Sequence, residues 1–363
     1  MRAEGGTVAT FGDALAALED FRANLVEAQI DATIPAPHAM AFRAAAAAPR
    51  SVLRNVHATG IGVRGEGRDP RSPDFVIKVY VFDEADVDQA TAEPFLARPH
   101  QGVEIDVEHL PIQIAFAKKM ARKTARPRVG NPAQHQAHIR PVPAGVEIGP
   151  LGGQFVGTLG CFVRRGPSDS GPLFVLSNNH VLADVNRFPL GTQHTQPFSA
   201  DPSDVIAALT DFEPIRFPAP GSQPRNVIDA AIARVTDPSQ IVLKRMLNIP
   251  NYTPQLLAPR PGMRVTKAGR TTGVTTGTIR AIRVRGVQVN YGTRQQPVIA
   301  TFDNAITITG SGGRPFSNPG DSGSVILDQS SGRPVALLFA GDETTTTACD
   351  VAAACARFNV RPV

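Results

Sequence analysis

Three residues of the chain, His180, Asp229 and Ser322, have the side chains that acyl transfer requires. A serine hydroxyl attacks a carbonyl when a base removes its proton, a carboxylate holds that base, and hydrogen-bond donors stabilise the oxyanion. Ser322 lies in the stretch NPGDSGSVILD, where Gly320 and Gly323 indicate a tight turn ahead of a buried strand. Because Gly, Asp and Ser are also common in ordinary turns, Ser322 is a candidate only together with its partners.

Both partners adjoin predicted strands. His180 directly follows the hydrophobic run of LSNNHVLAD, and Asp229 lies within the apolar strand NVIDAAIARV. A buried carboxylate is costly unless something pairs with it, so Asp229 needs a partner. Taken alone, His180 is more typical of a hydrogen-bonded turn and Asp229 of a strand end. The three residues occur in the order His, Asp, Ser: Asp229 follows His180 by 49 positions and Ser322 follows Asp229 by 93.

The residues from about 150 onward must position these side chains, and they form many short apolar runs separated by Gly and Pro. The runs are QFVGTLGCFV, PLFVLSNNHVLA, DVIAALTDF, VIDAAIARV, MRVTKAG, TTGTIRAIRVRGVQVNY, PVIATFDNAITIT, SVILD and PVALLFAG. Such runs predict a mainly β fold, either a sandwich or barrels. The Ala-rich end, TTTTACDVAAACARFNV, predicts a terminal helix in which Cys349 and Cys355 are buried residues rather than a disulfide.

Three motifs in order, NNHVLA, DAAIARV and PGDSGS, resemble those of trypsin-like serine peptidases with the chymotrypsin fold. TLGCFV, KAGRTTGVTTGTI and VALLFAGDETTTT resemble a bacterial subgroup that is distantly similar to the plant narrow-leaf proteins. In that subgroup a small domain often precedes the peptidase, and NVHATGIGVRG resembles its pattern. The resemblance spans about residues 52 to 345. It implies a mainly β chain with a chymotrypsin-like double β-barrel, preceded by a small α+β domain and an N-terminal helix.

The same resemblance implies a role for each site residue. His180 would be the general base and then the acid, Asp229 would orient its imidazole, and Ser322 would form the acyl-enzyme. The backbone N–H groups of Gly320 and Ser322 would form the oxyanion hole. No metal or organic cofactor is required. The activity implied is that of a serine endopeptidase acting on protein or peptide substrates.

The resemblance gives fewer indications about substrate specificity and about activation by cleavage. The resemblance places four residues near the first substrate pocket, and their character predicts a preference for apolar residues before the cut: Phe316, Phe339, Ala340 and Gly341. Asp342 and Glu343 nearby could reverse that preference. Secreted relatives carry a cysteine after the histidine, where this chain has Val181. VEIGPLGG at 146–153 lacks the activation pattern of zymogens, which leaves the partner of Asp321 open.

The chain divides into four predicted parts. Residues 1–50 form a helical extension with an amphipathic helix over 10–30, and residues 51–116 form a small α+β domain. Residues 117–145, which include AKKMARKTARPRVG, form a basic flexible linker, and 146–363 form the peptidase domain with its terminal helix. Basic, exposed linkers are common sites of cleavage, and self-cleavage within 117–145 is one hypothesis.

Composition limits the remaining function classes. A net charge of +5 is modest, and the basic linker has no aromatic residues for base stacking, so nucleic-acid binding is disfavoured. No apolar stretch of about 18 residues and no secretory signal are found, and three cysteines form an odd set, so we expect a cytoplasmic protein without a membrane span. The alternatives left open are a dormant peptidase scaffold that binds proteins and, less favoured, an esterase. The oligomeric state and physiological substrate are left open.

Overall fold

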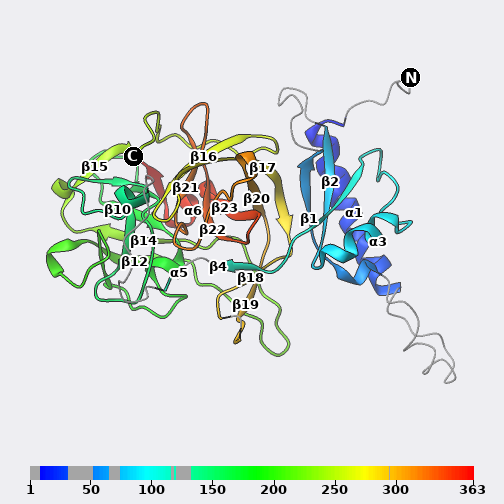
Figure 1. Ribbon diagram of the computed structural model, residues 1–363, viewed down its shortest axis with the longest axis horizontal. Coiled ribbons are helices and arrows are strands. Elements are labelled where there is room, and N and C mark those ends of the chain that lie inside the picture. Colours follow the sequence, from blue (N-terminus) through cyan, green and yellow to red (C-terminus); the bar gives the residue numbers. More distant parts are fainter. Residues whose placement is uncertain (1–8, 32–51, 65–73, 116–117, 120–131, 294) are drawn as a thin grey trace.

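The computed structural model describes residues 9–31, 52–64, 74–115, 118–119, 132–293 and 295–363. The described part is mainly β, as predicted, and consists of a small α+β domain followed by two closed rings of strands (Figure 1). In Figure 1 the small domain lies at one end of the molecule, the second ring in the middle and the first ring at the other end. The double β-barrel expected from the resemblance is therefore confirmed.

The small domain packs a long helix against a three-stranded sheet. Its elements are α1 (Phe11–Asp31), β1 (Val56–Val63), β2 (Phe75–Val81), α3 (Val87–Ala92) and β3 (Ile105–His109), with short 3₁₀ turns at Val52–Asn55 and Glu84–Asp86. Helix α1 begins where the Thr10 N–H donates to Asp13 Oδ2 (3.0 Å) and the Asp13 N–H donates to Thr10 Oγ1 (3.2 Å), a capping box. Ala14, Leu18 and Phe21 are fully buried at helical spacing, which confirms the amphipathic helix.

The sheet of the small domain continues into the second barrel. Strand β1 pairs with β2 on one side and antiparallel with β17 (Gly273–Arg285) on the other. The close approach requires glycine at two positions: a Cβ at Gly60 would lie 3.1 Å from the Ile282 carbonyl oxygen, and one at Gly62 would lie 2.8 Å from that of Arg280. The GIG of NVHATGIGVRG thus joins the two domains edge to edge.

The first barrel consists of strands β7 to β12 and β14. Its elements are β7 (Glu147–Pro150), β8 (Phe155–Thr158), β9 (Cys161–Arg165), β10 (Leu173–Ser177), α5 (Asn179–Leu182), β11 (Gln193–Thr195), β12 (Val205–Phe212) and β14 (Ala231–Val235). Pairing runs in the order β7, β11, β12, β14, β10, β9. Strands β8 and β9 are consecutive parts of the segment 155–165. Because β8 pairs with β7 and β9 pairs with β10, this segment closes the ring.

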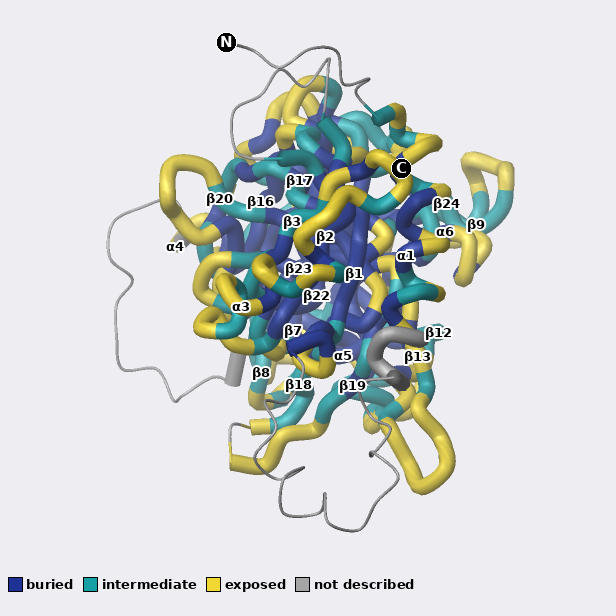
Figure 2. The backbone as a smooth tube through the Cα atoms, turned by 90° about the vertical axis from the view of Figure 1, so that its right-hand side faces the viewer, coloured by how far each residue is buried: buried dark blue, intermediate teal, exposed yellow. Residues whose placement is uncertain are grey.

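The second barrel is a closed ring of strands. Its strands are β16 (Arg264–Gly269), β17, β20 (Ala305–Gly310), β21 (Val325–Asp328), β22 (Pro334–Gly341) and β23 (Thr345–Asp350). Pairing runs β16, β17, β20, β23, β22, β21 and returns to β16. All six strands contribute to one buried cluster, which includes Val265, Ile279, Ile308, Ile326, Leu338 and Ala348. Figure 2 shows β22 and β23 among the buried parts of the chain.

Shorter elements connect and flank the barrels. They are β4 (Gln113–Ala115), β5 (Lys118–Lys119), α4 (Pro132–His135), β6 (Val142–Ala144), β13 (Arg225–Asn226), β15 (Ile241–Met246), β18 (Val287–Asn290), β19 (Ile299–Phe302), α6 (Val351–Phe358) and β24 (Val360–Pro362), with 3₁₀ turns at Pro202–Asp204, Pro238–Gln240 and Ser311–Gly313. Within the described ranges, no helix has the length and apolar character needed to cross a bilayer.

The structure differs from the sequence expectation at the C-terminal end. The threonines of TTTTACD form strand β23 rather than the start of a helix, because β-branched side chains favour the extended backbone. Helix α6 begins only after Asp350, whose side chain accepts a hydrogen bond from the Ala352 N–H (2.8 Å). Cys349 therefore lies on a strand and Cys355 on a helix, and both are buried and free.

The predicted linker is also partly ordered. Residues 132–144 contain α4 and β6, and β6 pairs with β15. His135 is fully buried, and its Nδ1 lies 2.7 Å from the Gly145 carbonyl oxygen. The apolar residues Val142 and Ala144 anchor this segment in the core of the first barrel. Most of the basic stretch, at 120–131, lies outside the described residues.

Two histidines, the half-buried His57 and the fully buried His194, make stability depend on pH. Burial lowers the pKa of His57 to about 4 and that of His194 also to about 4. His57 Nε2 lies 2.9 Å from the Leu110 carbonyl oxygen. The pKa of such a histidine is lower in the folded chain than its value of about 6.5 in the unfolded chain, so the folded chain binds fewer protons. Its contribution to the free energy of unfolding is therefore complete above pH 6.5 and is lost as the pH falls toward 4. We expect the free energy of unfolding in urea to fall by about 2 kcal/mol per histidine between pH 7.5 and pH 5.

Single-residue variants test whether His57 and His194 cause this pH dependence of stability. His57→Gln and His194→Gln should each reduce the difference in unfolding free energy between the two pH values. The matched control is His138→Gln, because the His138 side chain is exposed and should leave the difference unchanged. Equal pH dependence in the wild-type chain and both buried variants would contradict the assignment.

Candidate active site

The His180 imidazole and the Asp229 carboxylate form a buried pair at the end of the first barrel. His180 lies on the single turn α5, which follows β10 after one residue, and Asp229 lies two positions before the start of β14, which pairs with β10. His180 Nδ1 lies 2.6 Å from Asp229 Oδ2, and the two residues are 2% and 0% exposed. The His180 backbone N–H donates to Asp229 Oδ1 (3.3 Å). Because Nδ1–H is directed to the carboxylate, Nε2 is left as the basic nitrogen.

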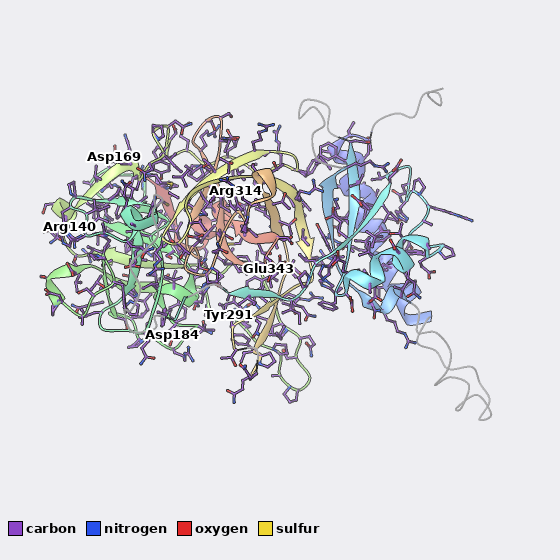
Figure 3. The ribbon with its side chains drawn as sticks, viewed as in Figure 1. Arg140, Asp169, Asp184, Tyr291, Arg314 and Glu343 are labelled. Carbon is purple, nitrogen blue, oxygen red and sulfur yellow. The ribbon has the colours of Figure 1, made fainter. Side chains whose placement is uncertain are left out.

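Tyr291 is a third member of this pair, and it was missed in the sequence. It follows β18, and its hydroxyl donates to Asp229 Oδ2 (2.9 Å) while its ring meets the His180 ring edge to face at 5.9 Å. Burial, followed by the charge of Asp229, raises the pKa of Tyr291 well above its usual range, so the phenol stays a donor. Figure 3 labels Tyr291 near the junction of the two barrels. The one sequence signal was its place at a strand end, beside no motif.

The loop that carries Ser322 is held in a conformation that requires glycine. Gly320 and Gly323 have φ values of +105° and +91°. A Cβ at Gly323 would lie 2.3 Å from the Thr158 carbonyl oxygen, so the loop can lie this close to β8 only with glycine there. Among the described residues, no acceptor is hydrogen-bonded to the N–H of Gly320 or of Ser322. Both N–H groups are thus free to stabilise an oxyanion.

The loop that carries Ser322 and the turn that carries His180 both approach strand β8 at Gly157. The Thr158 N–H donates to the Ser322 carbonyl (2.8 Å), and a Cβ at Gly157 would lie 2.5 Å from Val181 Cγ2 and 3.0 Å from the Ser322 oxygen. The Ser322 hydroxyl donates to the Phe339 carbonyl (3.3 Å). His180 Nε2 is buried and has no hydrogen-bond partner among the described residues. The Ser322–His180 hydrogen bond is therefore not made here, and such bonds are often formed only with substrate.

Asp321, whose partner the sequence left open, pairs with Lys267 of β16. Lys267 Nζ lies 3.3 Å from Asp321 Oδ2, and both side chains are fully buried. The N–H groups of Thr271 and Thr272 donate to Asp321 Oδ1 at 2.8 and 3.1 Å. Burial lowers the pKa of Lys267, and the charge of Asp321 opposes that shift. The positive charge beside Asp321 thus comes from within the chain, and the pair forms without a newly cut amino terminus.

The four residues named for the substrate pocket fall into two groups. Phe339, Ala340 and Gly341 are the last residues of β22, beside the Ser322 hydroxyl. Phe316 packs in the cluster inside the second barrel, with its ring 5.9 Å from Lys267 Nζ. Of the four, only Phe339 is in contact with Ser322, through its carbonyl, and the rings of Phe339 and Phe316 are both buried in the core. In the described part of the chain, no group of His, Cys, Asp or Glu side chains is placed to bind a metal.

Comparisons with known proteins found solved structures that are similar over part of the chain, whereas no family model and no curated protein matches. A glutamic-acid-specific serine protease is 21% identical, with 61% of this chain and all of that chain covered and a TM-score of 0.41. Protease A of Thermobifida fusca is 17% identical, covering 61% and 97% with a TM-score of 0.42. The Cellulomonas bogoriensis chymotrypsin is 18% identical, covering 61% and 98% with a TM-score of 0.41.

Proposed function

We propose that this chain, which has a trypsin-like fold, is a serine endopeptidase that cuts protein or peptide substrates through Ser322, His180 and Asp229. The observation that carries the proposal is the buried His180–Asp229 pair, joined at 2.6 Å, with Nε2 unbonded among the described residues and the Ser322 loop beside it. A buried imidazole held by a carboxylate, with its other nitrogen left basic, suits a general base.

The chemistry follows from these placements. Ser322 Oγ leaves the Phe339 carbonyl, transfers its proton to His180 Nε2 and attacks the substrate carbonyl carbon. The oxyanion that forms is bound by the N–H groups of Gly320 and Ser322, each contributing roughly 3 kcal/mol in studied enzymes. His180 then protonates the leaving amine, and water hydrolyses the acyl-enzyme by the reverse transfers.

Asp229 stabilises the imidazolium that arises when Nε2 takes the proton. In a site where His180 is 2% exposed, a positive charge without a partner would be strongly disfavoured. The carboxylate is held by Tyr291 and by the His180 backbone N–H, so it needs little rearrangement when the charge appears.

Labelling with a fluorophosphonate probe tests the proposal. We expect stoichiometric labelling of Ser322 in the purified chain, either intact or after limited proteolysis, and none in Ser322→Ala. His180→Ala should reduce the labelling rate at least about 10³-fold, since the serine loses its base. The control is Ser203→Ala, because Ser203 is exposed and lies outside the loop that carries Ser322, so labelling should be unchanged. Absence of labelling in both intact and clipped protein would refute the proposal.

A second candidate function is a dormant peptidase scaffold that binds proteins. The observation in its favour is that the Ser322 hydroxyl is bonded to the Phe339 carbonyl rather than to His180. If the chain is such a scaffold, we expect no labelling by the fluorophosphonate probe in either the intact or the clipped chain, and an unchanged fold in Ser322→Ala.

A further inference from the structure

The turn 318–321 sets the direction of the Gly320 N–H, one of the two proposed oxyanion donors. The Asp321 N–H donates to the Asn318 carbonyl (3.0 Å), Pro319 is the second residue of the turn, and Gly320, with a φ of +105°, is the third. Proline fixes its own φ at about −65°, and a positive φ at the next residue then identifies a type II turn. The four residues therefore form a type II turn.

The same four residues could also form a type I turn, which differs mainly in the direction of its central peptide. In type I, ψ of the second residue is about −30° rather than about +120°, and φ of the third is about −90° rather than about +80°. These two changes reverse the central peptide while the ends of the turn stay in place. Because the Gly320 N–H belongs to that peptide, the turn type decides whether this N–H points toward the oxyanion or away from it.

The Thr271 hydroxyl is bonded to the other end of this peptide. Thr271 lies in the turn between β16 and β17, and its Oγ1 donates to the Pro319 carbonyl oxygen (2.8 Å). The peptide between Pro319 and Gly320 is trans, so its C=O and N–H groups point in opposite directions. The bond therefore directs the Gly320 N–H away from Thr271, and among the described residues this N–H has no acceptor.

Three further contacts hold Thr271 in place. Its backbone N–H donates to Asp321 Oδ1 (2.8 Å), and Arg270 Nη1 donates to its Oγ1 (3.4 Å). Arg270 Nε in turn donates to Glu147 Oε2 of β7 (2.5 Å), and these two side chains are 5% and 6% exposed. Because the Thr271 oxygen accepts from Arg270, its own proton is directed to another acceptor, the Pro319 carbonyl. The first barrel thus takes part in placing this hydroxyl.

A second threonine holds the next carbonyl of the loop. Thr158 Oγ1 donates to the Gly320 carbonyl oxygen (3.0 Å) and accepts from the Arg270 N–H (3.0 Å). The peptides on both sides of Gly320 are therefore each bonded to a hydroxyl. Thr158 is fully buried, whereas Thr271 is half-buried and its acceptor residue Pro319 is exposed. The Thr271 hydroxyl is thus the one that can be removed without disturbing the core.

We propose that Thr271 is a positioning residue of the oxyanion hole: its hydroxyl holds the turn 318–321 in the type II form, which presents the Gly320 N–H to the oxyanion. The inference rests on the proposed peptidase function and adds a residue to that site. Thr271 acts through the peptide between Pro319 and Gly320 and touches none of the reacting atoms. Since Pro and Gly at these positions already favour type II, the hydroxyl strengthens an existing preference.

Hydrolysis of a chromogenic peptide by Thr271→Val tests the effect on the reaction. Valine keeps the branched shape and removes the hydroxyl. We expect kcat to fall about 3- to 10-fold, as for one lost hydrogen bond, with KM unchanged, because the oxyanion is bound mainly in the transition state. Thr271→Ser keeps a hydroxyl donor and should stay within about 2-fold of the wild-type kcat. The form of the chain used is the one that reacts with fluorophosphonate.

Thr275→Val is the matched control. Thr275 lies on β17 of the same hairpin, is half-buried like Thr271, and its Oγ1 donates to the Phe316 carbonyl oxygen (2.7 Å). This variant loses a hydrogen bond of the same kind, but the peptide that follows Phe316 lies outside the turn 318–321. Its free energy of unfolding should fall about as much as that of Thr271→Val, whereas its kcat should be unchanged.

A nuclear magnetic resonance measurement reads the turn without using activity. The Pro319 Hα and the Gly320 N–H lie close together when ψ of Pro319 is about +120° and apart when it is about −30°, so their nuclear Overhauser effect measures the fraction of type II turn. We expect this effect to be strong in the wild-type chain and weaker in Thr271→Val, in proportion to the loss in kcat. It should be unchanged in Thr275→Val.

Two other Pro–Gly pairs of the chain serve as internal references. They lie at 220–221 and 261–262, and their glycines have φ values of +75° and +81°. A sample with ¹³C-labelled proline and ¹⁵N-labelled glycine isolates these pairs together with 319–320. The Overhauser effects of the two reference pairs should be the same in all variants, and Pro319→Ala should remove the signal of 319–320, which assigns it.

The outcomes separate this inference from the proposed function. A wild-type chain that cuts the peptide, with Thr271→Val and Thr275→Val equally active, overturns the role of Thr271 and leaves the peptidase function standing. An unchanged Overhauser effect at 319–320 in Thr271→Val overturns the inference whatever the activity. A wild-type chain that neither reacts with fluorophosphonate nor cuts the peptide overturns the peptidase function, and a weaker Overhauser effect in Thr271→Val would still support Thr271 as the residue that holds the turn.

Discussion

Asp229→Asn is expected to lower kcat about 10⁴-fold with little change in KM. The Asp229 carboxylate accepts the Nδ1–H of His180, and in the proposed mechanism it would stabilise the imidazolium. An asparagine in its place can present an N–H₂ to Nδ1, which favours the wrong tautomer, and it carries no negative charge. The effect should appear in steady-state hydrolysis of a chromogenic peptide that has Phe before the cut, and the unfolding free energy should change by far less than the activation free energy.

Tyr291→Phe is the matched control for Asp229→Asn. This variant keeps the carboxylate and removes one hydrogen bond to Asp229 Oδ2, so we expect a loss in kcat of about 10-fold. Equal losses in the two variants would mean that the position of the carboxylate, rather than its charge, limits the reaction.

Lys267→Met is expected to destabilise the folded chain by about 3–5 kcal/mol. The substitution leaves the Asp321 carboxylate buried without its cation, and burying such an unpaired charge is strongly unfavourable. Asp321 directly precedes Ser322, so the fluorophosphonate labelling rate should fall as well. Urea unfolding at pH 7.5 gives the free energy of each variant.

Two further variants test the cause of that loss. Lys267→Met combined with Asp321→Asn removes both charges and should recover part of the stability, as often found when a buried ion pair is replaced by uncharged groups. Lys244→Met is the control at an exposed lysine and should change stability by less than about 0.5 kcal/mol. A cost below about 1 kcal/mol for Lys267→Met would show that the N–H groups of Thr271 and Thr272 suffice to hold the carboxylate.

Expectations that depended on local chemistry agree with the structure. Gly320 and Gly323 of PGDSGS have positive φ values. The buried carboxylate of Asp229, which lies just before strand β14, is paired with His180, as its burial requires. The short runs from residue 150 form two barrels, one of the two arrangements that their apolar pattern and turn residues predicted. The expectation of a helix at TTTTACD was wrong. It rested on the neighbouring Ala-rich stretch, whereas the β-branched threonines form a strand.

The sequence by itself determined which side chains could do chemistry, because a turn, a capped helix and an amphipathic strand are set by neighbours in the chain. Only the tertiary structure decided their distant partners. Lys267 meets Asp321, and Tyr291 reaches Asp229 from 62 positions away. The pairing of β4 with β22 brings Gln113 to Asp342, 229 positions apart. Such contacts follow from strand register and barrel closure, which no local pattern specifies.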